Sequence, residues 1–307
     1  MRTIWNKLMR MLAPSIQKLL LEIPISQIST IEEIRMRKGQ PLMLYAVDRS
    51  YFVTEDGWLT NVGGKCKVVQ EADILTTFDL LTGASVYAKQ DQIKQGFLTI
   101  EGGHRVGIAG TTVLKQGEIT HIKEISGLNI RVARQVMGVA DKVMVHIKQE
   151  ERILNTLILS PPGYGKTTLL RDIARQLGDG SRGIKVGIVD ERSEIAACVN
   201  GIPSFQVGVQ TDVLDRCPKC EGLKMMVRTL SPNVVITDEI GGADDLQALR
   251  EVLSSGVSVI TTAHAGSLAE LKRRPMMQAI LKEHIFDCFI VLHKDRNGYQ
   301  ILMDGVE

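Results

Sequence analysis

Hydrophobic and polar positions follow two different rhythms along this chain, and the change of rhythm divides it into two regions. In the first region, apolar residues alternate with polar ones in short segments broken by glycine-containing turns, a pattern typical of half-buried strands. Strands are predicted at Ile31 to Arg37, Pro41 to Val47, Gln95 to Ile100, Arg105 to Leu114 and Ile119 to Arg134, turns at Lys38-Gly39-Gln40 and Lys115-Gln116-Gly117, and a helix at Glu71 to Leu81. This region is expected to be an α+β domain.

Beyond about residue 140, short apolar runs alternate with helical patterns, as in βαβ units with a mainly parallel sheet. Strands are predicted at Thr156 to Ser160, Ile184 to Asp190, Asn233 to Glu239 and Ser258 to His264, and a final hairpin at Phe286 to Lys294 and Tyr299 to Met303 about Arg296-Asn297-Gly298. The sequence therefore predicts an α+β domain over residues 1–138 and an α/β domain over residues 139–307, with the junction between Val136 and Glu150. Ligands bind outside the carboxyl ends of strands in open α/β sheets, so the polar ends of the first four strands are expected to converge on one crevice.

The segment from residue 1 to residue 21 has an amphipathic helical pattern. One helical face carries Ile4, Trp5, Leu8, Met11 and Leu12. Such a face either packs onto its own domain, which we favour, or lies on a membrane surface. No run approaches the roughly 18 consecutive apolar residues of a membrane-spanning helix, and charges and a proline interrupt any signal-peptide core. A cytoplasmic protein is expected.

Composition indicates a folded, soluble protein whose charge favours no particular partner. The chain has 307 residues, of which 44% are hydrophobic and 23% charged, and its formal net charge is +2. This length allows two domains, each with its own core. A nucleic-acid partner is not expected, because such partners usually leave a clustered basic excess.

Five cysteines lack the spacing of a disulfide framework, and reduced thiols are expected. Two of them lie close together in Cys217-Pro218-Lys219-Cys220. This pair could bind zinc, form a redox couple or remain as loop thiols. Structural zinc needs four ligands, and the sequence offers no second pair of cysteines or histidines at a suitable spacing, which favours loop thiols.

A glycine-rich loop between a predicted strand and a predicted helix carries the strongest chemical signal. Ser160-Pro161-Pro162-Gly163-Tyr164-Gly165-Lys166-Thr167 has the layout of a phosphate-binding P-loop. Gly163 and Gly165 would adopt positive φ, so that backbone N–H groups and the helix N-terminus face the phosphates. Lys166 would follow the β- and γ-phosphates of ATP, and the Thr167 hydroxyl would ligate Mg²⁺. Nucleotide contacts are expected from Ser160, Pro161, Pro162, Gly163, Tyr164, Gly165, Lys166, Thr167 and Thr168, with serine at position 160 where the general pattern has glycine.

The apolar strand before Glu239 ends in two carboxylates and has the pattern of a Walker B element. Asp238 is expected to hold Mg²⁺ through water, and Glu239 to act as the general base toward the attacking water. The alternative is a buried strand whose acidic end only caps a turn. The P-loop earlier in the chain favours the catalytic interpretation.

Two other strand ends supply candidate catalytic residues. Glu191 follows the strand that ends at Asp190, and it is expected to order water or sense the γ-phosphate. The alternative for Glu191 is a solvated cluster at a helix start. His264 is expected to contact the γ-phosphate or to relay its state to a neighbouring subunit, although a lone histidine more often has a structural role.

In this order, SPPGYGKT, IVDERSEIA, NVVITDE and TTAHAGSLAEL resemble the Walker A, Asp box, Walker B and His box of the type II and type IV secretion ATPases. A generic AAA+ protein would share the first and third elements, but the second and fourth would not be expected there. The phrases VDERSEIAA, RTLSPNVVITDEIGG and EGGHRVGIAGT resemble a sporulation branch of this family, and the likeness spans almost the whole chain. The resemblance implies a RecA-like P-loop ATPase domain preceded by a smaller α+β domain.

The resemblance also carries expectations about assembly and role. Secretion ATPases of this type form hexameric rings in which the N-terminal domain moves against the nucleotide domain during ATP hydrolysis. Arginines of the N-terminal domain and linker then approach the phosphates, and Arg105, Arg131 and Arg134 are the candidates by position, the alternative being solvated strand charges. The implied role is a Mg²⁺-dependent ATPase that powers a mother cell to forespore transport channel. It would work at the cytoplasmic face of the membrane, with membrane proteins of the same sporulation operon as partners.

Two other functions stay open at the level of the sequence. P-loop rings also move nucleic acid, although the balanced charge and an aromatic content of 4% disfavour this. Ser160 would also suit a channel-base scaffold that binds nucleotide without hydrolysing it. No base-contacting motif distinguishes ATP from GTP.

Overall fold

The computed structural model describes residues 2–46, 49–61, 64–83, 89–115, 117–149, 152–180, 183–293 and 299–303. The chain divides into two compact units, Met1–Arg134 and Gln135–Glu307. This division falls a few residues before the predicted boundary after residue 138.

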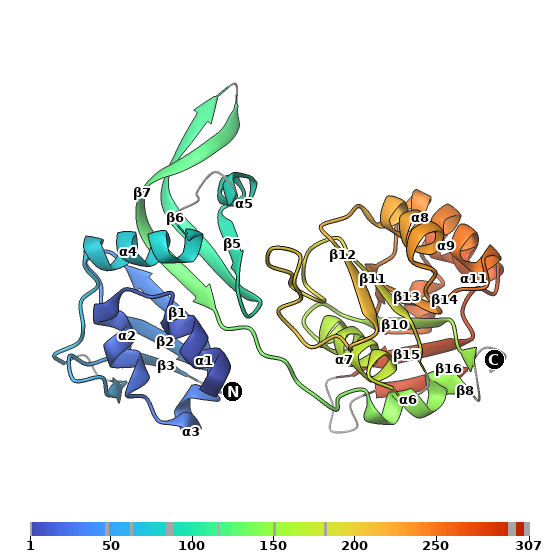
Figure 1. The fold of residues 1–307 in the computed structure, drawn as a ribbon, viewed down its shortest axis with the longest axis horizontal. Coiled ribbons are helices and arrows are strands. Elements are labelled where there is room, and N and C mark those ends of the chain that lie inside the picture. Colours follow the sequence, from blue (N-terminus) through green and yellow to red (C-terminus); the bar gives the residue numbers. More distant parts are fainter. Residues whose placement is uncertain are drawn as a thin grey trace. The chain divides into compact units, whose positions relative to one another are not determined.

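The first unit contains helices and an antiparallel sheet (Figure 1). Its elements are α1 (Arg2–Met9), α2 (Pro14–Leu21), α3 (Ile25–Ile28), β1 (Ile31–Arg37), β2 (Met43–Ala46), β3 (Ser50–Val53), β4 (Leu59–Thr60), α4 (Glu71–Thr82), α5 (Gln90–Lys94), β5 (Phe97–Ile100), β6 (His104–Lys115) and β7 (Glu118–Arg131). Within the described residues, its seven strands follow the order β4-β3-β2-β1-β7-β6-β5, and each neighbouring pair is antiparallel.

The predicted strands of this unit are present, with bounds that shift by a few residues. The strands β3 and β4 were not predicted, because strands of four and two residues are too short to show alternation. Val47 and Gln116, which the prediction placed in a strand and in a turn, lie outside the described residues.

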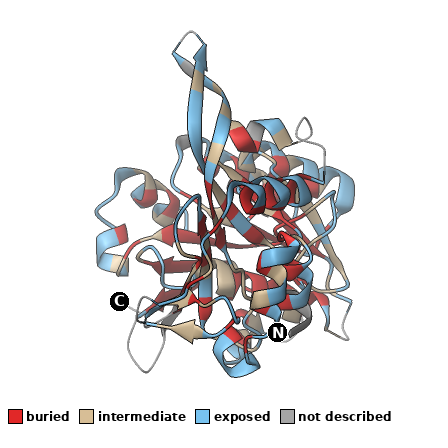
Figure 2. Ribbon diagram, turned by 90° about the vertical axis from the view of Figure 1, so that its left-hand side faces the viewer, coloured by how far each residue is buried: buried red, intermediate tan, exposed pale blue. Residues whose placement is uncertain are grey.

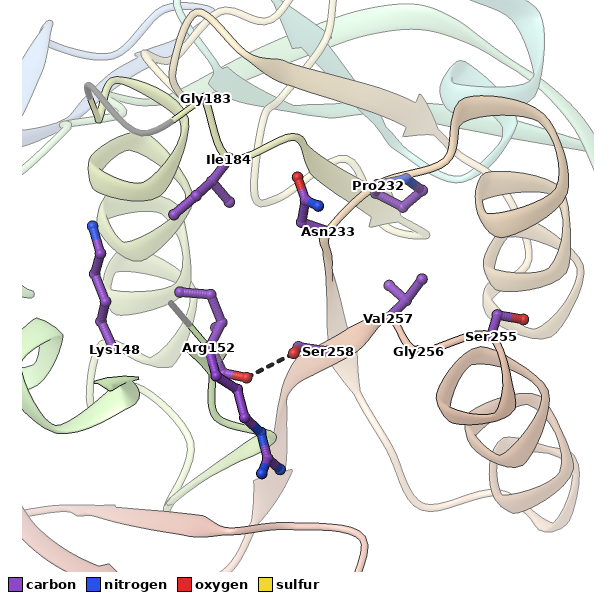
Figure 3. Close-up of a pocket in the computed structure, with 11 residues that line it drawn as sticks. Lys148, Arg152, Gly183, Ile184, Pro232, Asn233, Ser255, Gly256, Val257 and Ser258 are labelled. Carbon is purple, nitrogen blue, oxygen red and sulfur yellow. Dashed lines mark hydrogen bonds between the residues drawn. The ribbon is translucent and has the colours of Figure 1, made fainter. Parts of the chain in front are cut away.

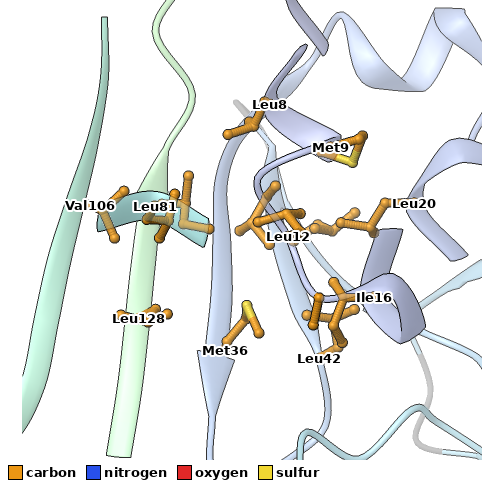
Figure 4. Packing of buried hydrophobic residues seen from close by; sticks show 14 of the residues in the cluster. Leu8, Met9, Leu12, Ile16, Leu20, Met36, Leu42, Leu81, Val106 and Leu128 are labelled. Carbon is orange, nitrogen blue, oxygen red and sulfur yellow. The ribbon is translucent and has the colours of Figure 1, made fainter. Parts of the chain in front are cut away.

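The core of this unit lies between the sheet and the helices α1, α2 and α4. Trp5, Leu8 and Leu12 are 2%, 0% and 1% exposed, and Figure 4 shows the helical segment beside buried side chains of the sheet such as Met36. The prediction that the amphipathic N-terminal face packs onto its own domain is therefore confirmed. By contrast, the outer part of the β6–β7 hairpin is mostly exposed (Figure 2).

The second unit is built on a mainly parallel sheet. Its elements are α6 (Asp141–Ile147), β8 (Lys148–Gln149), β9 (Arg152–Ile153), β10 (Thr156–Ser160), α7 (Lys166–Gly178), β11 (Val186–Asp190), β12 (Thr211–Asp215), α8 (Lys219–Leu230), β13 (Val234–Glu239), α9 (Ala243–Ser254), β14 (Ser258–His264), α10 (Leu268–Leu271), α11 (Pro275–Lys282), β15 (Cys288–Leu292) and β16 (Tyr299–Met303).

In the described part of this unit, the large sheet has the order β12-β11-β13-β14-β10-β15-β16. The six strands from β12 to β15 are parallel, and β16 adds to the edge in the antiparallel direction. The four strands that were predicted to end on polar residues are therefore neighbours in the sheet. The turn predicted at Arg296-Asn297-Gly298 lies outside the described residues, whereas the antiparallel pairing of β15 with β16 agrees with the predicted hairpin.

Helices cover both faces of this sheet, which is why its central strands are continuous apolar runs. One face packs against α6 and α7, where Leu170, Ile173 and Leu177 meet buried isoleucines of the strands. The other face packs against α8, α9 and α11, with Leu223 and Leu249 in the cluster. The predicted fold class, an α/β parallel-sheet domain that follows a smaller α+β domain in the chain, is confirmed. Among the described helices, none is both long enough and apolar enough to cross a membrane.

Candidate active site

The loop between β10 and α7 curls as the sequence predicts. Gly163 and Gly165 have φ of 81° and 89°, in the left-handed region, and a Cβ at either position would meet no atom within 4 Å. Because Gly165 is the N-cap of α7, no N-cap side chain covers the first N–H groups of the helix. The loop therefore offers open space and N–H donors at a helix N-terminus, which is what a phosphate requires.

Ser160 contributes to this loop from inside the domain. The residue is fully buried, and its hydroxyl donates to the carbonyl oxygen of Pro161 at 2.7 Å. Among the other residues predicted to contact the nucleotide, Pro162 and Tyr164 are exposed, whereas Pro161, Thr167 and Thr168 are half-buried. The side chain of Ser160 thus stabilises the entry to the loop rather than facing solvent.

Three of the predicted catalytic side chains meet at the carboxyl ends of the parallel strands. Lys166 Nζ lies 2.5 Å from Nδ1 and 3.2 Å from Nε2 of His264. His264 Nε2 in turn lies 2.9 Å from Glu239 Oε2, and these two side chains are 33% and 30% exposed. An imidazole that carries its proton on Nε2 would donate to Glu239 and accept at Nδ1 from the lysine ammonium, and the 3.2 Å approach of Nζ to Nε2 is then not a hydrogen bond.

Charged groups around Lys166 set its protonation. Burial lowers the pKa of Lys166. The carboxylates of Glu239 and Asp238 oppose this change, because they favour a nearby cation. Arg192 and Arg274 reinforce it, because they are like charges. These two arginines were not predicted as site residues, because their positions after β11 and before α11 match no motif in the sequence.

Asp238 lies at an irregular end of β13. The pairing of β13 with β14 shifts register between Ile236 and Glu239, and the carbonyl oxygen of Asp238 accepts a hydrogen bond from the Thr261 hydroxyl at 2.5 Å. The half-buried carboxylate of Asp238 is close enough to Lys166 to act on its charge.

The acidic end of β11 was predicted to face a crevice shared with the ends of three other strands. Its Asp190 carboxylate instead binds the backbone of the segment that follows the strand. Asp190 is fully buried, and its carboxylate accepts the N–H groups of Glu194, Ile195 and Ala196 at 2.8 to 3.0 Å. Burial raises the pKa of Asp190 in spite of these bonds. Glu191 is exposed in the turn that follows, and no hydrogen bond or ion pair among the described residues joins it to the cluster around Lys166.

Arg171 of α7 fixes the same segment from the other side. Its guanidinium donates at 2.6 Å to the carbonyl oxygens of Ile195 and Glu194 and stacks over the ring of Phe205 at 3.9 Å. Burial lowers its pKa to about 10. The P-loop helix and the segment after β11 are therefore tied together by a residue that sequence reasoning missed, because a single arginine in a helix does not reveal which face it occupies.

The three arginines predicted to reach a phosphate across a subunit interface lie in the first unit. Arg105 stacks over the ring of Phe97 at 4.0 Å and pairs in register with Arg131. Arg131 lies 3.6 Å from Glu33 and is 67% exposed. Arg134 donates to the carbonyl oxygen of Ile31. Their role toward nucleotide stays a prediction.

All five cysteines lie in the described part of the chain and are free thiols. Burial raises the pKa values of Cys217 and Cys220, and neighbouring carboxylates raise them further. Thiolates are the metal-binding and nucleophilic form, so this environment disfavours both uses. The described residues contain no group of three or more histidine, cysteine, aspartate or glutamate side chains that could hold a metal ion.

A cavity of about 1260 Å³ lies at the opposite, amino ends of the strands (Figure 3). It is lined by Lys148, Arg152, Ile153, Gly183, Ile184, Pro232, Asn233, Ser255, Gly256, Val257 and Ser258. Arg152 is already paired with Asp287 at 2.9 Å. The cavity is therefore separate from the P-loop cluster, which lies at the carboxyl ends of the same strands.

A P-loop on this parallel sheet, behind an antiparallel-sheet unit, defines the fold of the type II/IV secretion ATPases. The chain is similar to the ATPase DotB of Legionella pneumophila, with a TM-score of 0.56 and 16% identity, covering 91% of this chain and 78% of that one. It is also similar to the pilus retraction motor PilT with bound ADP, with a TM-score of 0.58 and 15% identity, covering 93% of this chain and 84% of that one. Identities this low show the fold alone.

Within that class, the chain belongs to the family of sporulation stage III protein AA, whose model matches residues 3–304. Stage III sporulation protein AA of Bacillus subtilis (strain 168) is 41% identical over 292 residues, 94% of this chain and 91% of that protein. The uncharacterized protein ycf45 of Porphyra purpurea is 32% identical over 182 residues, 59% of this chain and 31% of that protein. The predicted resemblance to a sporulation family is therefore confirmed, and the likeness to the secretion ATPases is one of fold.

Proposed function

We propose that this protein is a Mg²⁺-dependent ATPase of the secretion-ATPase type that powers a membrane transport channel required for sporulation. The observation that carries the proposal is that His264 joins Lys166, the first residue of α7, to Glu239. Lys166 Nζ lies 2.5 Å from His264 Nδ1, and His264 Nε2 lies 2.9 Å from Glu239 Oε2. Hydrolysis of a terminal phosphate uses a cation at the phosphates and a base for the attacking water, and Lys166 and Glu239 are residues of these two types.

The geometry of the loop supports binding of a triphosphate. Gly163 and Gly165 leave room where a Cβ would stand, and the N–H groups of the first turn of α7 have no N-cap side chain. The Thr167 hydroxyl and the Asp238 carboxylate are the residues that would hold Mg²⁺, Asp238 through water. Mg²⁺ bound there would neutralise charge on the β- and γ-phosphates.

Each member of the cluster has a defined task in this proposal. Glu239 accepts the proton of the attacking water at its carboxylate. Lys166 directs its ammonium to the β- and γ-phosphates, and His264 Nε2 keeps the Glu239 carboxylate oriented through its hydrogen bond. Arg105, Arg131 and Arg134 would complete the phosphate site from a neighbouring subunit of a hexameric ring, and Glu191 would order water beside it.

The cellular part of the proposal rests on the family. Membership in a sporulation family supports a role at the channel between mother cell and forespore, with membrane proteins of the same operon as partners. The fold shared with an ATPase and a pilus retraction motor supports coupling of hydrolysis to movement of one unit against the other. The protein would then act at the cytoplasmic face of the membrane on the mother-cell side.

Phosphate release by the wild type, Glu239→Gln and Lys166→Ala tests the enzymatic part. Both variants should lose at least about 100-fold in turnover, because one lacks the base and the other a phosphate cation. Glu221→Gln is the matched control, since Glu221 is a carboxylate with a 73% exposed side chain on the outer part of α8. Specific activity of the wild type should rise with protein concentration, because the site is shared between subunits.

The same variants in sporulating cells separate the alternatives. A motor requires that Glu239→Gln cells fail to form spores. Normal sporulation with hydrolysis abolished would identify a nucleotide-binding scaffold instead. Hydrolysis stimulated by single-stranded DNA in a salt-sensitive manner would identify a nucleic-acid motor.

A further inference from the structure

The end of β13 is not a regular strand. From Ile236 to Glu239 the chain advances three residues, whereas the paired residues Ile260 and Thr262 on β14 are two apart. One extra residue on a strand is a β-bulge, which bends the strand and breaks the strict alternation of side chains. The bulge therefore decides where the carboxylates of Asp238 and Glu239 point.

Two side chains donate hydrogen bonds to the carbonyl groups of this bulge. The hydroxyl of Thr261 donates to the carbonyl oxygen of Asp238. Lys219, the first residue of α8, donates from Nζ to the carbonyl oxygen of Glu239. Its side chain is only 11% exposed.

Lys219 is held in place by a second buried charge. Its Nζ lies 3.2 Å from Oδ1 and 3.4 Å from Oδ2 of Asp245, whose side chain is 6% exposed. Asp245 also accepts the N–H groups of Gly241 and Gly242, each at 2.7 Å. Burial acts to raise the pKa of Asp245, but the two N–H groups and Lys219 outweigh it and hold the pKa below its ordinary value. The pair thus clamps both Glu239 and the turn that follows it.

We infer that Lys219 is a positioning residue that fixes the bulge at Glu239 and so aims the Glu239 carboxylate at His264. The inference rests on the proposed function, because it assigns Lys219 a task only if Glu239 is the base. It also gives the Cys217-Pro218-Lys219-Cys220 segment a use without metal or redox chemistry: the segment brings the lysine to the start of α8. Cys220 adds a weak contact to Asp245, with its sulfur 3.8 Å from Oδ1.

A pair of double variants tests this without leaving a buried charge unpaired. Lys219→Met/Asp245→Asn removes both charges, and the asparagine oxygen still accepts from Gly241 and Gly242. Lys219→Gln/Asp245→Asn is its matched partner, because glutamine and methionine are similar in length and only glutamine donates an N–H. Both should melt within about 3 °C of each other. The methionine variant should lose roughly 10- to 100-fold in kcat, as expected for a misplaced catalytic group, and the glutamine variant should recover several-fold of that loss.

Binding and placement controls complete the experiment. The dissociation constant for a fluorescent ADP should stay within about twofold in both variants, because the P-loop is untouched. Arg175→Met/Asp172→Asn is the control for loss of an ion pair elsewhere, since these side chains are 17% and 1% exposed and Asp172 likewise accepts a backbone N–H. Its kcat should match the wild type.

The outcomes separate this inference from the proposed function. Wild-type rates in both double variants, beside an inactive Glu239→Gln, would overturn the positioning role alone. Equal losses in the methionine and glutamine variants would also overturn it, because the donor N–H would then be irrelevant. A wild-type rate in Glu239→Gln would overturn the proposed base and this inference with it.

Discussion

The amine of Lys166 and the imidazole of His264 form a direct contact, 2.5 Å from Nζ to Nδ1. The other imidazole nitrogen lies 2.9 Å from Glu239 Oε2. The two groups come from different elements, the start of α7 and the end of β14, which are brought together because β10 and β14 pair in parallel with Ser160 opposite His264. One side chain therefore links the phosphate-binding lysine to the proposed base.

This link predicts opposite effects of His264→Ala on binding and on turnover. A bound phosphate competes with the imidazole for the lysine ammonium, so removal of His264 should tighten ADP binding by up to about fivefold, the equivalent of one hydrogen bond of about 1 kcal/mol. Turnover should fall by at least about tenfold, because the Glu239 carboxylate loses its partner. Fluorescent-ADP titration and phosphate release measure the two effects. Equal losses of binding and turnover would instead make His264 a ligand for the nucleotide.

The charge environment of Lys166 predicts a pH dependence of ADP binding. Burial lowers the pKa of Lys166 below its ordinary value of 10.5. Since the ammonium is the form that binds phosphate, affinity should fall as pH rises through this lowered pKa. Glu239→Gln removes an opposing carboxylate and should move the midpoint to lower pH, whereas Arg274→Gln removes a like charge and should move it up.

The control for this pH series is Arg250→Gln, which neutralises an arginine that pairs with Glu283. It should leave the midpoint unchanged. Titration of ADP affinity from neutral to alkaline pH in the four proteins gives the comparison. Identical midpoints in all of them would mean that Lys166 does not control binding in this range.

Gly165→Ala should abolish the phosphate site with little additional cost to folding. The left-handed φ of 89° costs an alanine about 1–2 kcal/mol, and its methyl group would project into the space of the loop. Gly256→Ala is a matched control, because its φ is 74° and its Cβ would also meet no atom within 4 Å, but it lies at the amino ends of the strands. Both variants should lose similar thermal stability, and only Gly165→Ala should lose ADP binding. Equal ADP affinity in the two variants would contradict a phosphate cradle at Gly165.

The sequence predicts the strands that carry the site better than it predicts the contacts within it. The bounds of β10 and β14 match the predicted Thr156 to Ser160 and Ser258 to His264, because each is an apolar run with a polar end. The meeting of Glu239 with His264 follows from parallel topology. The edge strand β12 was missed, since it is partly exposed and has no continuous apolar run.

Other contacts depend on distances that no local pattern contains. Asp190 and Asp238 both follow an apolar strand in the sequence, yet the Asp190 carboxylate accepts hydrogen bonds from backbone N–H groups of the turn that follows it. Arg171 and Lys219 find their carbonyl partners only after the helices have packed on the sheet. Buried arginines and lysines that belong to no sequence motif are therefore the hardest residues to predict from the sequence.

The buried side chain of His104 is expected to make the stability of the first unit fall at acid pH. Burial lowers its pKa to about 4, from 6.5. Its Nδ1 accepts the N–H of Ala133 at 3.0 Å, and Nε2 has no hydrogen-bond partner among the described residues. The folded unit therefore keeps this imidazole neutral, whereas the unfolded chain protonates it near pH 6.5. Stability should fall by about 3 kcal/mol as pH decreases from 6.5 to 4, because only the unfolded state gains the proton in that window.

Urea unfolding of the full chain, followed by tryptophan fluorescence, measures this step, since Trp5 and Trp58 both lie in the first unit and Trp5 is only 2% exposed. His104→Asn keeps an acceptor for Ala133 but cannot titrate, so its stability should change much less between pH 6.5 and pH 4. His121→Asn is the control, because His121 is exposed on β7 and the same substitution there should leave the pH dependence of the wild type intact. A parallel pH dependence in His104→Asn and the wild type would show that other groups cause the acid sensitivity.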